Sequence, residues 1–221
     1  MENIELKRLM IKYEYAQESI NTYLDKLIKL YELEYKYNPV EHIKTRIKSQ
    51  KSATKKLERK GYEITTENIK DHVHDMVGFR VICLFLSDVY DIVDFIKKSN
   101  QFEIKEENDY IKNPKESGYK SYHLNVLIPI IIDNKKEYIE AEIQVRTVAM
   151  DFWASIDHKL RYKLGTDVPE NFEKELFDCS QEIGTMDVNM QKLYEIVKSY
   201  KSDENSIKTK EVEKPKILIK K

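Results

Sequence analysis

Glu140-Ala141-Glu142-Ile143-Gln144-Val145-Arg146-Thr147 alternates polar and apolar side chains from its first residue to Arg146. Side chains of a β-strand point alternately to opposite faces, so this pattern predicts a strand with one apolar and one polar face. Residues 121–130 alternate in the same way, and Asp133-Asn134 between the two segments favours a tight hairpin turn. If the two apolar faces share one core, the polar faces coincide and carry His123, Asn125, Glu142 and Gln144.

Helical spacing dominates elsewhere in the chain. Apolar residues recur three or four positions apart over residues 4–35, and the basic segment 40–60 also reads as helical, with Gly61 as its C-cap. β-Branched and apolar residues favour further strands at 77–85 and 102–107. Other helices are expected at 66–74, 87–99, 147–163 and 167–200. The sequence therefore predicts an α+β fold: a mixed β-sheet of about five strands flanked by helices, with long N- and C-terminal helices.

The bulk properties bound the class of protein. A chain of 221 residues suits one sizeable core with appendages. We expect an N-terminal helix over 1–38, a central domain over 39–165, a C-terminal helix over 166–201 and a loose tail over 202–221. The 38 Lys and Arg balance 39 Asp and Glu, which argues against a surface devoted wholly to nucleic acid.

The two cysteines and the apolar runs point to a cellular compartment. Cys83 and Cys179 show neither metal-site spacing nor a disulfide framework, and Cys83 lies in an apolar run that favours a buried free thiol. The N-terminus lacks a signal-peptide pattern, and no apolar run approaches membrane-spanning length. The sequence predicts a cytoplasmic protein that makes no membrane contact.

Carboxylates gather near the expected sheet face. Asp75 lies just before the strand at 77–85, and Glu142 belongs to the polar face of the hairpin. Two carboxylates on neighbouring strands can hold Mg²⁺ together with phosphate oxygens and water. Gly78 would let a ligand approach the backbone closely. The alternative is that the polar face is only the solvated side of an antiparallel sheet.

Basic residues stand before and after these carboxylates. Polar residues in the first basic segment recur at three- and four-residue spacing: Lys48, Ser52, Lys56 and Arg59. In a helix they would line one side and could follow a polyphosphate. In the later basic loop, Tyr119 could stack on a base, flanked by Lys112, Lys115 and Lys120. The alternatives are a solvated basic face and a turn aromatic that covers the core.

Five ordered motifs make the chain resemble the RelA/SpoT-type alarmone synthetases, in particular their small stand-alone form. The motifs are Arg46-x-Lys48-Ser49-x-x-Ser52, Asp75-x-x-Gly78-x-Arg80, Tyr110-Ile111-x-Asn113-Pro114-Lys115, Gly118-Tyr119-Lys120-Ser121-x-His123 and Glu142-Ile143-Gln144-Val145-Arg146-Thr147. They fall in family order between about residues 40 and 160. The order of all five is far more specific than any single motif.

That resemblance implies a nucleotidyltransferase-like fold and a GTP diphosphokinase, which moves the β,γ-pyrophosphate of ATP to the 3′-hydroxyl of GDP or GTP and releases AMP. By motif position, the ATP-binding residues would be Arg46, Lys48, Ser52, Lys56, Arg59 and Arg80, with the two arginines on either side of adenine. The acceptor pocket would be lined by Lys112, Tyr119, Lys120, His123, Asn125 and Gln144, with Tyr119 stacked on guanine. Asp75 and Glu142 would be catalytic and would bind Mg²⁺, and Glu142 would activate the 3′-hydroxyl.

The resemblance also implies partners and leaves alternatives open. It implies a homotetramer assembled through the terminal helices, and it allows an alarmone as allosteric ligand and single-stranded RNA as a further partner. Residues 106–109 occupy the place of a family signature linked to acceptor choice and match neither its basic nor its acidic form, so GDP, GTP and GMP all stay open. The competing functions are an RNA-binding module and a nucleotidyltransferase relative that modifies tRNA.

Overall fold

A five-stranded mixed sheet forms the centre of the computed structural model, which describes residues 4–98, 101–164 and 168–211. Its strands are β1 (Val40–Ile47), β2 (Val77–Cys83), β3 (Glu103–Asp109), β4 (Tyr122–Ile132) and β5 (Lys135–Thr147), in the order β1-β2-β5-β4-β3. β2 and β5 run parallel, and the other neighbouring pairs are antiparallel. The predicted α+β fold with a mixed sheet of about five strands is confirmed.

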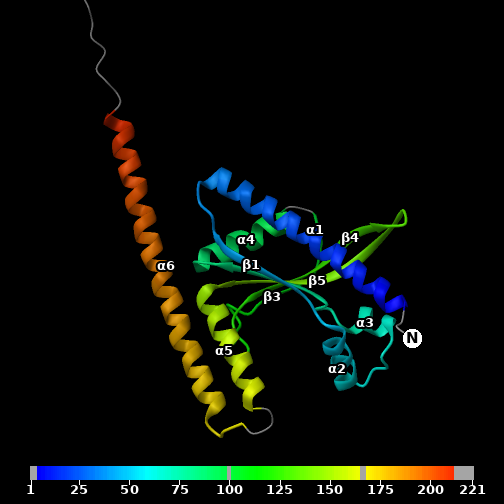
Figure 1. Ribbon diagram of the computed structural model, residues 1–221. Coiled ribbons are helices and arrows are strands. Elements are labelled where there is room, and N and C mark those ends of the chain that lie inside the picture. Colours follow the sequence, from blue (N-terminus) through cyan, green and yellow to red (C-terminus); the bar gives the residue numbers. More distant parts are fainter. Residues whose placement is uncertain (1–3, 99–100, 165–167, 212–221) are drawn as a thin grey trace, which may run out of the picture.

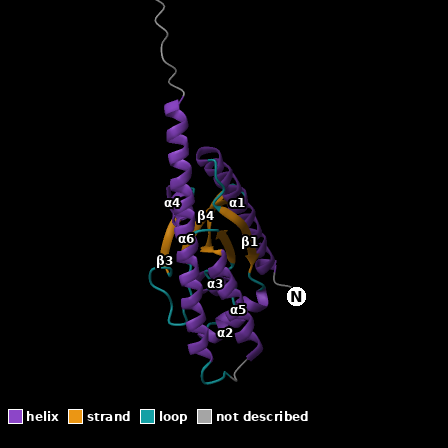
Figure 2. Ribbon diagram, turned by 90° about the vertical axis from the view of Figure 1, so that its left-hand side faces the viewer, coloured by secondary structure: helices purple, strands orange, loops and turns teal. Residues whose placement is uncertain are grey.

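Helices lie on both sides of this sheet (Figure 1). They are α1 (Ile4–Tyr35), α2 (Gln50–Lys60), α3 (Thr66–His72), α4 (Leu86–Lys98), α5 (Val148–Leu164) and α6 (Phe172–Glu211). α1 and α4 cover one face, whereas α5 lies toward the other face and packs against α6. α6 runs past the ends of the central strands, and Figure 2 shows it in front of the sheet. Within the described residues, no helix combines the length and apolar character needed to cross a bilayer.

The covered face of the sheet carries the core. Leu124, Val126 and Ile128 of β4 are fully buried, as are Ala141 and Ile143 of β5. α1 contributes a stripe whose members are three or four residues apart: Leu9, Tyr13, Ala16, Ile20, Leu24, Leu27 and Tyr31. Burying an aliphatic side chain of this size contributes roughly 1.5–3 kcal/mol, so this face fixes the register of the hairpin. The opposite, polar face is left for the site.

The segment 40–60 is not one helix as expected. Its first half, Val40–Ile47, is the strand β1, and only α2 is helical. Val40, Ile43 and Ile47 fall at helical spacing, but pairing with β2 satisfies the backbone and overrides that local pattern. α2 begins after Ser49, whose hydroxyl accepts a hydrogen bond from the backbone N–H of Ser52. Three expected helical positions therefore remain on α2, and Lys48 lies in the connection before it.

Local signals set several other boundaries correctly. Asp133 and Asn134 have φ of 52° and 59°, as a two-residue hairpin turn with two left-handed positions requires. Thr147 caps α5, because its hydroxyl accepts the backbone N–H of Met150 at 3.1 Å. α6 begins at Phe172 rather than near residue 167, and it continues to Glu211, so residues 202–211 are helical and do not belong to a loose tail as expected. The expected boundaries at 99 and 167, and the tail from 212 onward, lie outside the described residues.

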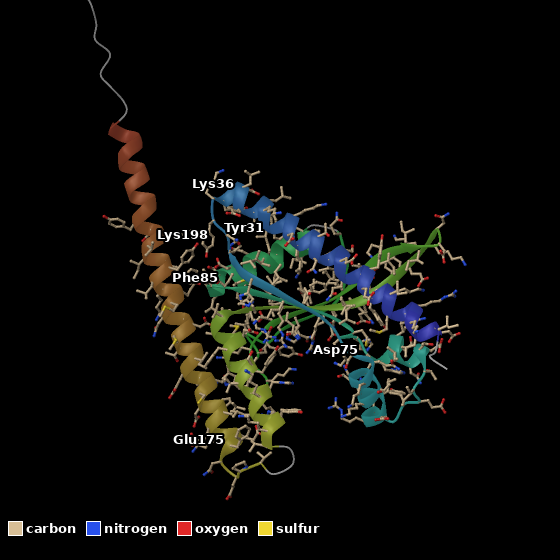
Figure 3. The ribbon with its side chains drawn as sticks, viewed as in Figure 1. Tyr31, Lys36, Asp75, Phe85, Glu175 and Lys198 are labelled. Carbon is tan, nitrogen blue, oxygen red and sulfur yellow. The ribbon has the colours of Figure 1, made fainter. Side chains whose placement is uncertain are left out.

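α6 is fastened to the body along its first part. The Ser180 hydroxyl donates to the Gly118 carbonyl at 2.5 Å, and the indole N–H of Trp153 donates to the Leu176 carbonyl at 3.1 Å. Further along, the ring of Tyr194 stacks on Phe85 with centroids 4.3 Å apart. Figure 3 shows Phe85 and Lys198 on this side of the molecule. The loop before β4 is thus held in place by a helix that follows it in sequence.

Replacing Gly118 by alanine should destabilise the protein strongly. Gly118 has φ of 88°, and a Cβ there would lie 2.6 Å from Cβ and Oγ of Ser180. Backbone strain and the steric clash together should lower the free energy of unfolding by roughly 2–4 kcal/mol, measured by urea unfolding. Gly61→Ala is the matched control, because Gly61 has φ of 77° but no atom within 4 Å of the added Cβ. Equal losses in the two variants would contradict the role of the Ser180 contact.

Candidate active site

Polar residues from four strands meet on the face of the sheet opposite α1 and α4. Gly78 of β2 lies opposite Arg46 of β1 on one side and opposite Glu142 of β5 on the other. Glu142 in turn lies opposite Asn125 of β4. One step along the strands, a second row runs through Lys44, Arg80, Gln144 and His123. The shared polar face predicted from alternation is therefore confirmed, and β1 and β2 extend it.

A hollow of about 130 Å³ opens where Gly78 lacks a side chain. The Arg46 side chain lies over it, with Cγ and Nε each 3.6 Å from the position of a Gly78 Cβ. Arg80 lies two residues along from Gly78, which makes it the diagonal neighbour of Arg46. Diagonal neighbours in an antiparallel pair are roughly 7–8 Å apart, and guanidinium planes stack well on flat rings. This geometry can take a planar base between the two arginines.

Asp75 is paired with two lysines from the basic segment. Its carboxylate accepts a hydrogen bond from Lys48 and another from Lys56, the second at 2.7 Å. Burial opposes ionisation of Asp75, but the hydrogen bonds and charges of the lysines outweigh burial and lower its pKa to about 2. Figure 3 shows Asp75 at the end of the sheet beside α2. The three side chains form a charged cluster that polyphosphate and a cation could reorganise.

Glu142 stands at the centre of the polar face. Its carboxylate lies 3.0 Å from Nδ1 of His123 and accepts a hydrogen bond from the Gln144 amide at 2.6 Å. Burial raises the pKa of Glu142, and the charge of Asp75 raises it further. The hydrogen bonds from His123 and Gln144, together with the His123 charge, outweigh both and lower the pKa. The group is thus held as a carboxylate with hydrogen-bond partners on both oxygens.

The carboxylates fit a cation that is shared with a ligand. Among the described residues, no cluster of three or more His, Cys, Asp or Glu side chains could hold a metal ion by itself. Asp75 and Glu142 are close enough for the charge of one to shift the pKa of the other. Mg²⁺ is usually held by one or two carboxylates together with phosphate oxygens and water, so this donor set fits Mg²⁺ bound along with a nucleotide.

Tyr119 lies on the His123 side of Glu142. Its hydroxyl lies 2.8 Å from Nε2 of His123 and accepts a hydrogen bond from Arg146 at 3.0 Å. The half-buried ring lies near two cations, with its centroid 5.4 Å from Nζ of Lys115 and 5.5 Å from the Arg146 guanidinium. Burial is the main cause that raises the pKa of Tyr119. Both readings of this ring, base stacking and core cover, are compatible with that position.

The expected site residues are not all brought together. Lys120 points at α6, where its Nζ lies 2.3 Å from the position that a Gly184 Cβ would occupy, so it does not join His123 in this structure. Lys112 is exposed and lies 3.3 Å from the Asp109 carboxylate. Ser52 and Arg59 are exposed on α2. The sheet thus supplies the centre of the site, and these four residues lie around its margins.

Two buried charged residues at the polar face, one on the sheet and one on a helix, were not among the site residues expected from the sequence. Arg146 is only 2% exposed although it is charged, and Asp151 of α5 is 7% exposed. The alternation of β5 places Arg146 on the same face as Glu142, which was a usable signal. No pattern in the sequence places Asp151 there, because its position depends on how α5 folds back over the sheet. Buried charges of this kind need partners, and the partners here belong to the site.

A mixed sheet with guanidinium groups, lysines and carboxylates on one face defines a class of protein that handles phosphorylated nucleotides. Residues 45–167 match the family described as a region found in RelA / SpoT proteins. GTP pyrophosphokinase YwaC of Bacillus subtilis (strain 168) is 42% identical over 184 residues, which cover 83% of this chain and 88% of that protein.

Solved structures agree with this match. The crystal structure of small alarmone synthetase 2 from Bacillus subtilis has a TM-score of 0.78 at 38% identity and covers 86% of this chain and 98% of that one. Small alarmone synthetase 1 from Bacillus subtilis, bound to its product pppGpp, has a TM-score of 0.80 at 32% identity and covers 88% of this chain and 99% of that one. The chain belongs to the RelA/SpoT family, and its fold is that of the small alarmone synthetases.

Proposed function

We propose that this protein is a GTP pyrophosphokinase that makes (p)ppGpp, by moving the β,γ-pyrophosphate of ATP to the 3′-hydroxyl of GDP or GTP. The observation that carries the proposal is the position of Glu142. On one side of it lies the hollow at Gly78, and on the other side lie Asn125, His123 and Tyr119. The curated relative named above is a GTP pyrophosphokinase, and pppGpp is the product bound to one structural relative. Since these nucleotides are cytoplasmic, we place the enzyme in the cytoplasm.

The donor half of the site would bind ATP. Arg46 and Arg80 would hold adenine between their guanidinium planes over Gly78, which explains why a glycine stands at that position. Lys48 and Lys56 would leave Asp75 and neutralise the phosphates, with Ser52 and Arg59 of α2 adding donors along the chain of phosphates. The N-terminus of α2 supports the same role, because the positive end of a helix dipole favours anions.

The acceptor half would bind the guanosine nucleotide. Asn125, Gln144 and His123 offer hydrogen-bonding groups around Glu142, and the Tyr119 ring would stack on guanine. Lys112 and Lys120 would reach this pocket only by turning from their present partners, Asp109 and the surface of α6. Glu106 accepts hydrogen bonds from Asn108 and Asn125, and this supports a position of the segment 106–109 beside the proposed acceptor. GDP, GTP and GMP all fit this description.

Glu142 would act as the general base of the transfer. The 3′-oxygen forms a bond to the β-phosphorus of ATP, and the bond from that phosphorus to the α,β-bridging oxygen breaks with its electron pair leaving on AMP. The proton of the 3′-hydroxyl passes to Glu142, which His123 and Gln144 hold as a carboxylate. Asp75 and Glu142 would hold Mg²⁺, which when bound neutralises charge on the phosphates.

One assay tests this function directly. The protein is incubated with ATP, Mg²⁺ and GDP, GTP or GMP in turn, and the nucleotides are separated by anion-exchange chromatography. AMP and a 3′-pyrophosphorylated guanosine nucleotide should appear in equal amounts, because one transfer makes one of each. A tRNA 3′ end offered as acceptor separates the tRNA-modifying alternative. No product with any guanosine nucleotide would contradict the proposal.

We also propose a homotetramer assembled through the terminal helices. Exposed apolar side chains on α6 recur at alternating four- and three-residue steps: Met186, Met190, Leu193, Val197 and Tyr200. Such a stripe on a helix favours packing against another helix. Sedimentation velocity should give a tetrameric mass, and a monomeric mass would exclude the assembly. Binding of single-stranded RNA or of an alarmone at a second site stays a prediction.

A further inference from the structure

One carboxylate of α5 lies among cations from three different strands. Oδ2 of Asp151 is 3.4 Å from Nζ of Lys44 on β1, and its Oδ1 is 3.9 Å from Nη1 of Arg80 on β2. The same Oδ1 is 3.5 Å from Nη1 of Arg146 on β5. Asp151 lies in the first turn of α5, so it reaches the sheet from outside rather than through strand pairing.

Arg146 carries this contact on to the acceptor side. Its Nη2 donates hydrogen bonds to the Tyr119 hydroxyl, at 3.0 Å, and to the Gln144 amide oxygen. Its Nη1 faces Asp151, so the planar guanidinium group spans from α5 to the acceptor pocket. A lysine would keep the charge but could not reach both sides at once.

Asp151 accepts one hydrogen bond, from Lys44 to its Oδ2, whereas its contacts with Arg80 and Arg146 are charge contacts. Its buried Oδ1 has no hydrogen-bond partner among the described residues, and neither does Nε of Arg146. A buried carboxylate lowers the stability of the fold unless cations stay beside it, and in turn it holds those cations in place. Removal of its charge therefore takes away the attraction that holds their side chains. The cations that would be released belong to both halves of the site: Arg80 to the donor half, and Arg146, with Tyr119 and Gln144, to the acceptor half.

From this geometry we propose that Asp151 and Arg146 are positioning residues that set both nucleotide pockets from one point on α5. Asp151 orients Arg80 for adenine and holds Arg146, and Arg146 orients Tyr119 and Gln144 for the guanosine nucleotide. Neither residue takes part in bond making. The inference rests on the proposed function, since it assigns Arg80 and Tyr119 to the two nucleotides.

Steady-state kinetics with both nucleotides varied tests the proposal. In Asp151→Asn, which keeps size but removes charge, KM should rise roughly tenfold for ATP and for the guanosine nucleotide alike. In Arg146→Lys, KM should rise roughly tenfold for the guanosine nucleotide while KM for ATP changes little, because the charge beside Asp151 and Arg80 remains. Asp157→Asn is the control: Asp157 lies on the same helix and pairs with Arg161 at 2.6 Å, away from the site.

Direct binding separates this inference from the proposed function. Calorimetry with a non-hydrolysable ATP analogue, and separately with GDP, reports the two pockets even in a protein that makes no product. Weaker binding of both ligands by Asp151→Asn, but of GDP alone by Arg146→Lys, supports the proposal. Unchanged affinities, or a fall in kcat with both KM values unchanged, overturns it. If Asp151→Asn does not fold, the split between the two ligands in Arg146→Lys decides the question, and equal loss of both ligands there overturns the proposal.

Discussion

Glu142→Gln should reduce kcat by about 10²–10⁴-fold and leave the fold intact, because glutamine keeps the shape of Glu142 but cannot take a proton. The side chain of Glu142 contacts His123 and Gln144, and a glutamine in its place can accept from the Gln144 amide with its oxygen and donate to Nδ1 of a neutral His123 with its NH2 group. The loss should therefore fall on kcat, because the proton acceptor and one of the two proposed Mg²⁺ ligands are both lost.

The control for this variant is a second glutamate on the same strand. Glu140 lies two residues from Glu142 on the same face, where it contacts His74 at 2.9 Å and Lys105 at 2.9 Å. Glu140→Gln should keep kcat close to that of the unmodified protein, because these partners lie outside both nucleotide pockets. Rapid-quench measurement of product formation compares the two variants. A Glu142→Gln protein whose kcat stays within about tenfold of the unmodified enzyme would remove Glu142 from the role of general base.

Asp75→Asn should have opposite effects on catalysis and on metal-free binding of ATP. In the present structure the Asp75 carboxylate accepts hydrogen bonds from Lys48 and Lys56, which are the lysines proposed to bind phosphate. An asparagine would free both, so a non-hydrolysable ATP analogue should bind more tightly in EDTA. With Mg²⁺ present, the variant should lose most turnover, because one of the two proposed ligands is gone. Calorimetry with and without EDTA, beside activity assays, measures both effects.

The same variant should change the acid stability of the protein. The pKa of Asp75 is lowered to about 2, so its contribution to stability is present above the ordinary carboxylate pKa near 4 and is lost as the pH falls toward 2. That contribution is about 2 kcal/mol, and Asp75→Asn should lack it at neutral pH. Asp71→Asn, on the exposed side of α3, serves as control. The proposal fails if Asp75→Asn binds metal-free ATP less tightly and unfolds with an unchanged pH profile.

The sheet face could be predicted from sequence because it depends on strand alternation alone. His123, Asn125, Glu142 and Gln144 lie together since a strand has a side-chain period of two and one face of this hairpin is buried. The segment 40–60 could not be divided correctly, because Val40, Ile43 and Ile47 fit a helical period as well as an edge strand. Pairing with the neighbouring strand β2 is what makes residues 40–47 a strand rather than a helix.

Sequence patterns alone predict the hairpin, its polar face and the ends of several helices, and they contain the ordered motifs of the RelA/SpoT family. These features depend on residues close together in the chain, where period and capping suffice. Folding of the whole chain is needed to pair Lys48 and Lys56 with Asp75, to bring Lys120 against α6, and to bring three cations to Asp151. These contacts join elements far apart in sequence, and a buried charge is stable only where folding brings its partner. The alternating stretch Glu140–Thr147 therefore predicts a polar face, while the helices packed around the sheet decide which charged side chains on that face are paired.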